Sequence, residues 1–200
     1  RAAIWRNWGL SALPTLATGV NSQVFWMNNV GDSAGLSETD TIDATCAVPF
    51  QRRRFEAVRW SRAGRIERLQ LLPGDTVSFA FGVNEFGQTV GAAGLCSNTF
   101  IPPLGAPSGP HAVLWDRNGA PTALGTVPGA NAYAATAINN RGDVAGNAIF
   151  ADGSVHPVLW TNQGKPTDLG VAAGDFVTIV PCCGTINNRG DVVGFSCGPM

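Results

Sequence analysis

The chain has 200 residues, of which 44% are hydrophobic and 14% are charged, and its formal net charge is −1. This length allows one domain with a sizeable core. The near-zero net charge excludes a global field that would recruit nucleic acid or an anionic membrane surface, and no apolar run is long enough to span a bilayer. The 25 glycines, the 13 prolines and the absence of sustained 3.6-residue periodicity predict an all-β chain with many turns.

The first recurring unit is a short strand that ends in Trp, a turn that contains Gly, and a second strand that ends in Leu. Its clearest copies are HAVLWDRNGAPTALG at residues 111–125 and HPVLWTNQGKPTDLG at residues 156–170, and weaker copies begin near residues 2 and 56. We expect each copy to be a β-hairpin whose Trp packs in the core. The tryptophans are Trp5, Trp60, Trp115 and Trp160, which are 55, 55 and 45 residues apart.

The second recurring unit is a pair of short apolar arms around Asn-x-x-Gly. It reads AINNRGDVAG at residues 137–146 and TINNRGDVVG at residues 185–194, with degenerate copies at residues 27–35 and 83–91. Asn and Gly tolerate the positive φ of tight turns, so this unit also predicts a β-hairpin. Its first asparagines keep nearly the period of the tryptophans, which indicates a four-fold internal repeat. They are Asn28, Asn84, Asn139 and Asn187, which are 56, 55 and 48 residues apart.

Each repeat contains two hairpins and therefore four short antiparallel strands. Four-stranded units of about 40–50 residues in tandem are typical of the blades of a β-propeller. We therefore predict one propeller-like domain over residues 1–200, built from four repeats, with the Asn hairpin innermost. The first Trp hairpin and the last Asn hairpin would together complete one blade. This arrangement fits a closed four-bladed propeller, and it fits equally a segment of a larger one.

Two insertions interrupt the repeats, at residues 36–55 and 92–110. They occupy equivalent places in neighbouring repeats, so we expect them side by side on one face. The first carries the run Arg52, Arg53 and Arg54. These arginines form either local salt bridges in a solvated loop or an anion-recognising surface, because guanidinium groups make two-point contacts with carboxylate, sulfate or phosphate. The second interpretation predicts an acidic protein or an acidic polysaccharide as the partner.

The five cysteines do not follow the Cys-x-x-Cys spacing of metal sites. We therefore expect no zinc site and no other cofactor. Cys46 and Cys96 lie in the two insertions and are predicted to join neighbouring repeats. Disulfides of this kind favour an oxidising compartment and hence an extracellular protein.

The other three cysteines flank the last Asn hairpin. Cys182 and Cys183 enter this hairpin and Cys197 leaves it. If Ile186 faces Val192 across the turn, Cys182 comes opposite a residue adjacent to Cys197. A disulfide from Cys182 or Cys183 to Cys197 is then within geometric reach.

Two motifs suggest chemistry but recur with the repeat. His111 and His156 occupy the same repeat position, which favours a structural hydrogen bond over acid–base catalysis. Arg-Gly-Asp at residues 141–143 and 189–191 lies inside the turn that the repeat requires. We expect its Asp to make a local turn bond rather than to serve cell adhesion.

Some residues depart from the repeat. Trp8, Trp26 and Phe86 lie outside the repeat register, so they are better candidates for exposed stacking on sugar rings than the core tryptophans. Glu85 is the sole acid that replaces a neutral residue in an Asn-hairpin turn. An enzyme is expected to gather such non-repeated acids and bases around one opening, and here they are scarce.

The paired motifs at residues 137–146 and 111–125 resemble the HAF-type repeats of bacterial extracellular proteins. This resemblance implies secretion and a propeller-like array, and it carries no established activity or catalytic residue. Residues and resemblance together favour a non-enzymatic extracellular scaffold or binding module that uses loops on one face. The alternatives are a hydrolase or lyase with a site at a central opening, or a glycan-binding lectin. Self-association is a further expectation if the chain is part of a larger array.

Overall fold

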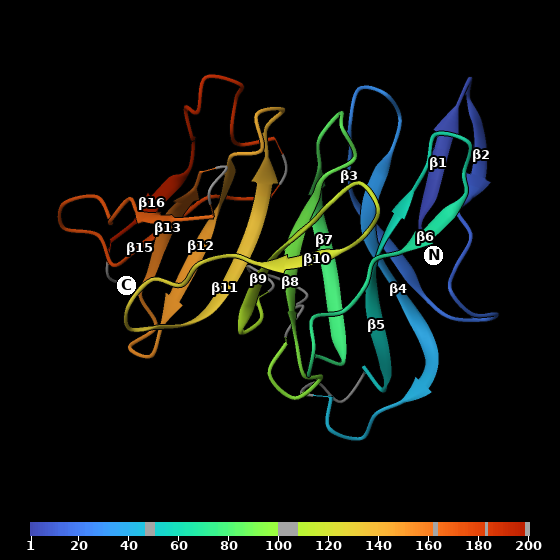
Figure 1. The fold of residues 1–200 in the computed structure, drawn as a ribbon, viewed down its shortest axis with the longest axis horizontal. Coiled ribbons are helices and arrows are strands. Elements are labelled where there is room, and N and C mark those ends of the chain that lie inside the picture. The colour runs from blue at the N-terminus through green and yellow to red at the C-terminus, as the bar shows by residue number, and fades with distance from the viewer. Residues whose placement is uncertain (47–50, 100–107, 162–163, 183, 199–200) are drawn as a thin grey trace.

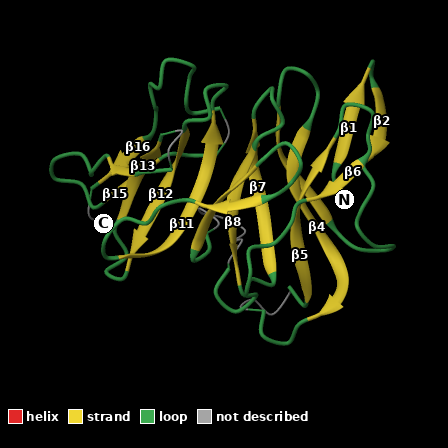
Figure 2. Cartoon of the chain, in the orientation of Figure 1, coloured by secondary structure: helices red, strands yellow, loops and turns green. Residues whose placement is uncertain are grey.

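The computed structural model describes residues 1–46, 51–99, 108–161, 164–182 and 184–198 (Figure 1). These residues form strands, turns and loops without any helix, which confirms the all-β prediction (Figure 2). The strands are β1 (Ala3–Arg6), β2 (Gly9–Ala12), β3 (Ser22–Met27), β4 (Ser33–Ile42), β5 (Arg53–Trp60), β6 (Ile66–Arg68), β7 (Val77–Val83), β8 (Thr89–Gly94), β9 (His111–Trp115), β10 (Pro121–Ala123), β11 (Ala130–Ile138), β12 (Val144–Phe150), β13 (Val155–Trp160), β14 (Pro166–Asp168), β15 (Val177–Ile179) and β16 (Phe195–Cys197).

The strands form four separate sheets. β1 and β2 form a two-stranded sheet, β3–β6 and β7–β10 form two four-stranded sheets, and β11–β16 form a six-stranded sheet. None of these sheets is closed, so the prediction of a propeller built from four four-stranded repeats is wrong. The hairpin β1–β2 and the hairpin β15–β16 lie towards opposite ends of the long axis (Figure 1).

The repeat nevertheless determines the pairing inside the complete sheets. The second strand of each Asn hairpin pairs with the first strand of the following Trp hairpin, β4 with β5, β8 with β9 and β12 with β13. Glycine in that second strand allows the hairpin arms to approach closely. A Cβ added to Gly91 would lie 1.9 Å from the carbonyl oxygen of Phe79, and one added to Gly146 would lie 2.0 Å from that of Ala134.

The last Asn hairpin attaches differently, which is why one sheet has six strands. β15 joins β13 through a single parallel bridge between Val155 and Val177, and β16 pairs with β15. The buried side chain of Asn147 supports this attachment. Its Oδ1 accepts from the N–H of Val180 at 2.8 Å, and its Nδ2 donates to the carbonyl of Val180 at 2.9 Å. An apolar residue occupies the position of Asn147 in the two preceding repeats.

The core lies between successive sheets, where three of the four repeat tryptophans are at most 1% exposed. Each of these three indole Nε1 groups donates a hydrogen bond of 2.7–2.8 Å to the backbone carbonyl of the residue that directly follows the Leu of the preceding Trp hairpin. Trp5 is 69% exposed, so the prediction of a core position is wrong for this residue. The hairpin β1–β2 has no strand-paired neighbour among the described residues, which leaves most of the Trp5 side chain exposed. The donors and acceptors are Trp60 and Pro14, Trp115 and Gln70, and Trp160 and Gly125.

Candidate functional site

The turns of the Asn hairpins share a geometry that their first Asn sets. In the third repeat, Asn139 Oδ1 accepts from the backbone N–H groups of Arg141 and Asp143, both at 2.9 Å, and Gly142 adopts a φ of 84°. Asn84 and Asn187 make the same pair of bonds in their own turns. The Asn closes the turn and the Gly supplies the left-handed residue, which explains the recurrence of Asn-x-x-Gly.

The same asparagines also link one turn to the next. Each Nδ2 donates to the backbone carbonyl of the corresponding Asn in the following repeat, so the four turns form a continuous ladder. Asn28, Asn84 and Asn139 are buried, and the ladder uses both their amide groups and their carbonyls. We therefore assign this first row of asparagines to architecture. The three bonds are Asn28 to Asn84 at 2.8 Å, Asn84 to Asn139 at 3.1 Å and Asn139 to Asn187 at 2.9 Å.

A second row follows one residue later in each turn. Asn29 Nδ2 donates to Glu85 Oε1 at 2.8 Å, the Glu85 N–H donates to Asn140 Oδ1 at 3.0 Å, and the Asn140 N–H donates to Asn188 Oδ1 at 2.9 Å. Within the described residues, the Nδ2 groups of Asn140 and Asn188 have no protein acceptor. This row therefore offers amide donors and one carboxylate to a ligand.

The four turns surround a depression of about 290 Å³ that residues of all four Asn hairpins line. Trp26 contributes an aromatic wall, is 36% exposed and packs against Gly184, where an added Cβ would lie 2.9 Å from the indole. Glu85 is the only titratable residue among the described residues that line the depression. This combination suits a neutral, hydroxyl-rich ligand. Glycoside hydrolysis generally needs a pair of carboxylates, which this lining does not supply.

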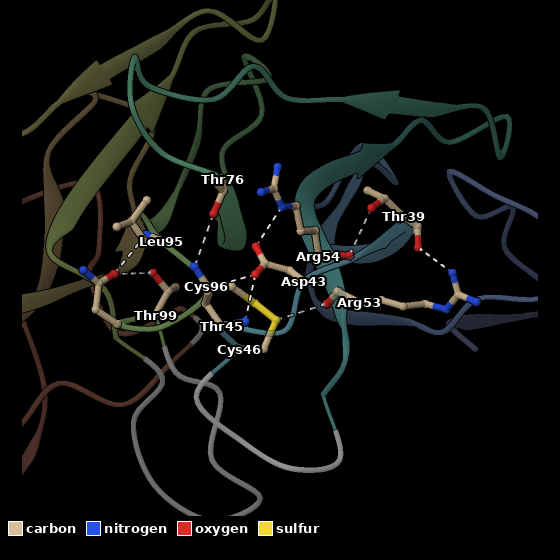
Figure 3. The surroundings of a disulfide bond; sticks show 11 residues. Thr39, Asp43, Thr45, Cys46, Arg53, Arg54, Thr76, Leu95, Cys96 and Thr99 are labelled. Atoms are coloured by element: carbon tan, nitrogen blue, oxygen red, sulfur yellow. Dashed lines mark hydrogen bonds and ion pairs between the residues drawn. A yellow bond between two sulfur atoms is a disulfide. The ribbon is translucent and has the colours of Figure 1, made fainter.

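The two insertions meet at the other end of β4 and β8. Cys46 and Cys96 form a disulfide with a Cα–Cα distance of 4.3 Å, which confirms the predicted pairing and joins the insertions (Figure 3). The buried Cys96 also donates its N–H to Thr76 Oγ1 at 3.2 Å. The described parts of the insertions therefore lie side by side, as expected.

Local bonds engage two of the three predicted arginines at this end. Arg53 Nη1 donates to the carbonyl of Asp40 at 3.0 Å. Arg54 Nε donates to Asp43 Oδ2 at 2.9 Å (Figure 3). Hydrogen bonds from Thr45, with the Arg54 guanidinium adding to them, lower the pKa of Asp43 to about 2. Arg52 is exposed; its backbone carbonyl accepts from the N–H of Asp43 at 2.9 Å, and its side chain makes no hydrogen bond or ion pair within the described residues. The salt-bridged interpretation thus describes Arg54, whereas Arg53 bonds to backbone carbonyls of the same insertion and the side chain of Arg52 stays open to a partner.

The predicted pairing of Cys182 with Cys197 is wrong, because both are free and exposed. Ile186 does face Val192 as expected. The next pair, however, is Ile179 with Phe195, so six residues on one arm oppose two on the other. These extra residues shift the register, so Cys182 does not come opposite β16. Cys183 lies outside the described residues.

The histidines form equivalent cross-strand contacts with different partners. His111 Nδ1 lies 2.9 Å from Asp75 Oδ2, and His156 Nδ1 lies 2.9 Å from Asp168 Oδ2. The residue of the third repeat that corresponds to Asp168 is Ala123, which has no carboxylate. His111 contacts Asp75 instead, in the loop before β7. Each histidine has one carboxylate partner and no adjacent nucleophile among its hydrogen-bond partners.

The first complete sheet carries a charge-reversed version of the same contact. Glu56 occupies the repeat position of the histidines, and Arg68 occupies the position of Asp168; the two form a salt bridge of 3.1 Å. Burial is the main effect on Glu56 and raises the pKa of its carboxyl. A pair that recurs with its charges exchanged indicates that the contact holds two strands together, which supports the structural interpretation of the histidines.

The Arg-Gly-Asp motif, the metal site and the membrane span considered from the sequence can also be compared with the structure. In the Arg-Gly-Asp segment at residues 141–143, Arg141 Nη2 binds Asp143 Oδ2 at 2.6 Å within the same turn. The described residues contain no group of three or more His, Cys, Asp or Glu side chains placed to hold a metal ion. No helix is described, and hence none that is long and apolar enough to cross a membrane.

Comparison with known proteins places no relative beside this chain: no family model, no curated protein and no solved structure matches it. The assignment of a site therefore depends on its own geometry. Sequence reasoning identified Trp26 and Glu85 separately, and the structure brings both to one depression. It missed Asn140 and Asn188, although the doubled Asn in three of the four turns was a signal that one of the two remains available to a ligand.

Proposed function

We propose that the protein is a non-enzymatic extracellular binding module with HAF-type repeats. The repeat motifs support this family. The disulfide between Cys46 and Cys96 is what an oxidising compartment allows. The two histidines considered for catalysis, His111 and His156, occupy the same repeat position and each contacts a carboxylate. This structural role favours binding over catalysis.

The ligand that best suits the depression is a neutral carbohydrate. The observation that carries this proposal is the meeting of the Trp26 indole with the amide donors of Asn140 and Asn188 and the carboxylate of Glu85. A sugar presents hydroxyl groups that both donate and accept, and an apolar ring face that stacks on an aromatic side chain. The volume of about 290 Å³ lies at the small end of ligand pockets, so we expect one or two sugar rings at the end of a glycan.

A glycan array followed by calorimetry with the best neutral oligosaccharide tests this proposal. Asn140→Asp and Asn188→Asp preserve the accepting oxygen that the second row uses, and they replace the free amide donor with a carboxylate oxygen that cannot donate. We expect each to weaken binding about tenfold, and Trp26→Ala to weaken it at least as much. Phe86→Ala is the matched control, because Phe86 is an exposed aromatic residue of an Asn turn that does not line the depression.

Two outcomes would contradict the carbohydrate proposal. One is an array without any bound neutral glycan. The other is binding that both Asn→Asp variants leave unchanged while the Phe86→Ala control weakens it.

The disulfide-joined insertions remain a second candidate surface, favoured by the exposed and unpaired Arg52. There we expect a sulfated or carboxylated polymer or an acidic protein. Binding to a heparin column checks this. Arg52→Ser should elute at lower salt than the wild type. The distal Arg189→Ser change, also at an exposed arginine, should leave elution unchanged. Equal elution of the wild type and Arg52→Ser would exclude this surface.

A further inference from the structure

The segment of residues 193–197, which contains β16, exposes residues at its outer edge that every preceding repeat buries. In the first three repeats, the second strand of the Asn hairpin pairs with a Trp hairpin, and its residues at the positions of Val193 and Phe195 are at most 7% exposed. Val193 itself is 65% exposed and Phe195 is 51% exposed. Leu169 is 46% exposed, whereas the corresponding Leu of each earlier Trp hairpin is at most 8% exposed. This end of the molecule therefore presents the apolar face and strand edge that normally receive a Trp hairpin.

The hairpin β1–β2 is the matching element at the other end. It has the sequence of a Trp hairpin, and β1 pairs only with β2 among the described strands. Trp5 has no acceptor for its indole N–H within the described residues. The other repeat tryptophans donate to the carbonyl that directly follows the Leu of the preceding Trp hairpin. For the exposed Leu169, that carbonyl belongs to Gly170.

We propose that β1 of one copy pairs antiparallel with residues 191–194 of a second copy, the segment that leads into β16, so that copies associate head to tail. The internal repeats determine the register. Trp60 lies opposite Ser33, Trp115 opposite Thr89 and Trp160 opposite Val144. The corresponding pair across the interface joins Trp5 of one copy to Val192 of the other.

The same register accounts for the remaining exposed groups. Ala3 of one copy then faces Gly194 of the other, as Val158 faces Gly146 inside the chain. The Trp5 indole reaches the carbonyl of Gly170, and its ring covers Leu169. A second copy thus offers the strand edge, the apolar cover and the indole donor that this surface lacks, which is the mode of strand addition at a sheet edge.

The interface joins two different surfaces, so it is heterologous. Because the two surfaces lie towards opposite ends of the long axis (Figure 1), every added copy leaves one of each kind free. Association should therefore continue beyond the dimer as concentration rises.

Sedimentation and light scattering over a concentration series test the proposal on the 200-residue chain. The wild type should pass from monomer to dimer and larger species. Trp5→Ser and Val193→Asp should each weaken association at least about tenfold. Phe86→Ser alters an equally exposed aromatic residue away from both surfaces and should associate as the wild type does.

Mixing the two interface variants is the decisive experiment. Trp5→Ser retains an intact β16 edge, and Val193→Asp retains an intact β1–β2 hairpin, so the mixture should form a dimer and nothing larger. That recovery also shows that both variants are folded. A wild type that stays monomeric at its highest soluble concentration, or a mixture that forms no dimer, would overturn the proposal.

Discussion

Removal of the disulfide between Cys46 and Cys96 should cause a large loss of stability. The bond joins residues 50 apart. The chain-entropy relation for a closed loop of that length gives about 4 kcal/mol at 25 °C. For a domain of this size, about 4 kcal/mol corresponds to a fall in Tm of roughly 8–16 °C. Because Cys96 is buried, the appropriate variant is Cys46→Ala with Cys96→Ala; a Ser at position 96 would place an additional hydroxyl in the core.

Urea unfolding followed by tryptophan fluorescence measures this loss. Thiol reduction of the wild type provides a second measurement that does not change the side-chain packing. Cys182→Ser with Cys197→Ser is the control, since both thiols are free and exposed. The reasoning is refuted if the Cys46 and Cys96 variant loses less than about 1 kcal/mol, far below the entropic value, or if the control loses as much.

Three further changes test the packing and the electrostatics of the fold. Thr89→Val should raise the free energy of unfolding by about 1–2 kcal/mol, which chemical denaturation measures. The buried Thr89 hydroxyl has no hydrogen-bond partner among the described residues, and Val144 occupies the same repeat position. Trp160→Phe should lower stability by about 1–3 kcal/mol in the same assay, because it leaves the Gly125 carbonyl without its donor. Asp43→Asn should remove a pH dependence of stability. The pKa of Asp43 is about 2 in the folded state, below the ordinary value of 3.8. The ionised carboxylate therefore stabilises the fold fully above pH 3.8, and this contribution is lost as the pH falls towards 2. Thermal melts of wild type and variant between pH 2 and 5 should converge at the acidic end, and a constant gap would count against this cause.

The sequence was sufficient for the local structure because the hairpins are determined by nearby residues. The period of the Trp and Asn markers predicted the repeated hairpins, and equivalent insertions predicted the Cys46–Cys96 bond. The sequence did not show that the sheets stay separate instead of closing into a propeller. Closure depends on how hairpins from distant repeats meet, and a single parallel bridge at Val155 redirects the last hairpin. No periodic marker reports the amide contact of Asn147 that holds it there.

The candidate site was partly readable for a related reason. Trp26 and Glu85 differ from the repeat and could be recognised as departures from it. Asn140 and Asn188 match the repeat, and only the ladder of hydrogen bonds distinguishes the structural first Asn from the available second one. The failed Cys182–Cys197 pairing has a similar origin, since extra residues between two correct strand pairs carry no signature in an otherwise regular hairpin.

Because of the ladder of asparagines, the two ends of the molecule should differ in how readily their loops accept insertions during evolution. At the turn end, every loop is tied to the next by its side-chain amide, so an inserted residue would break contacts in two repeats at once. At the disulfide end, one covalent bond holds the insertions together, and the loops can lengthen around it without disturbing a neighbour's backbone. Sequence diversification and grafted peptides should therefore be tolerated at the disulfide end, whereas the turn end keeps a constant spacing between repeats.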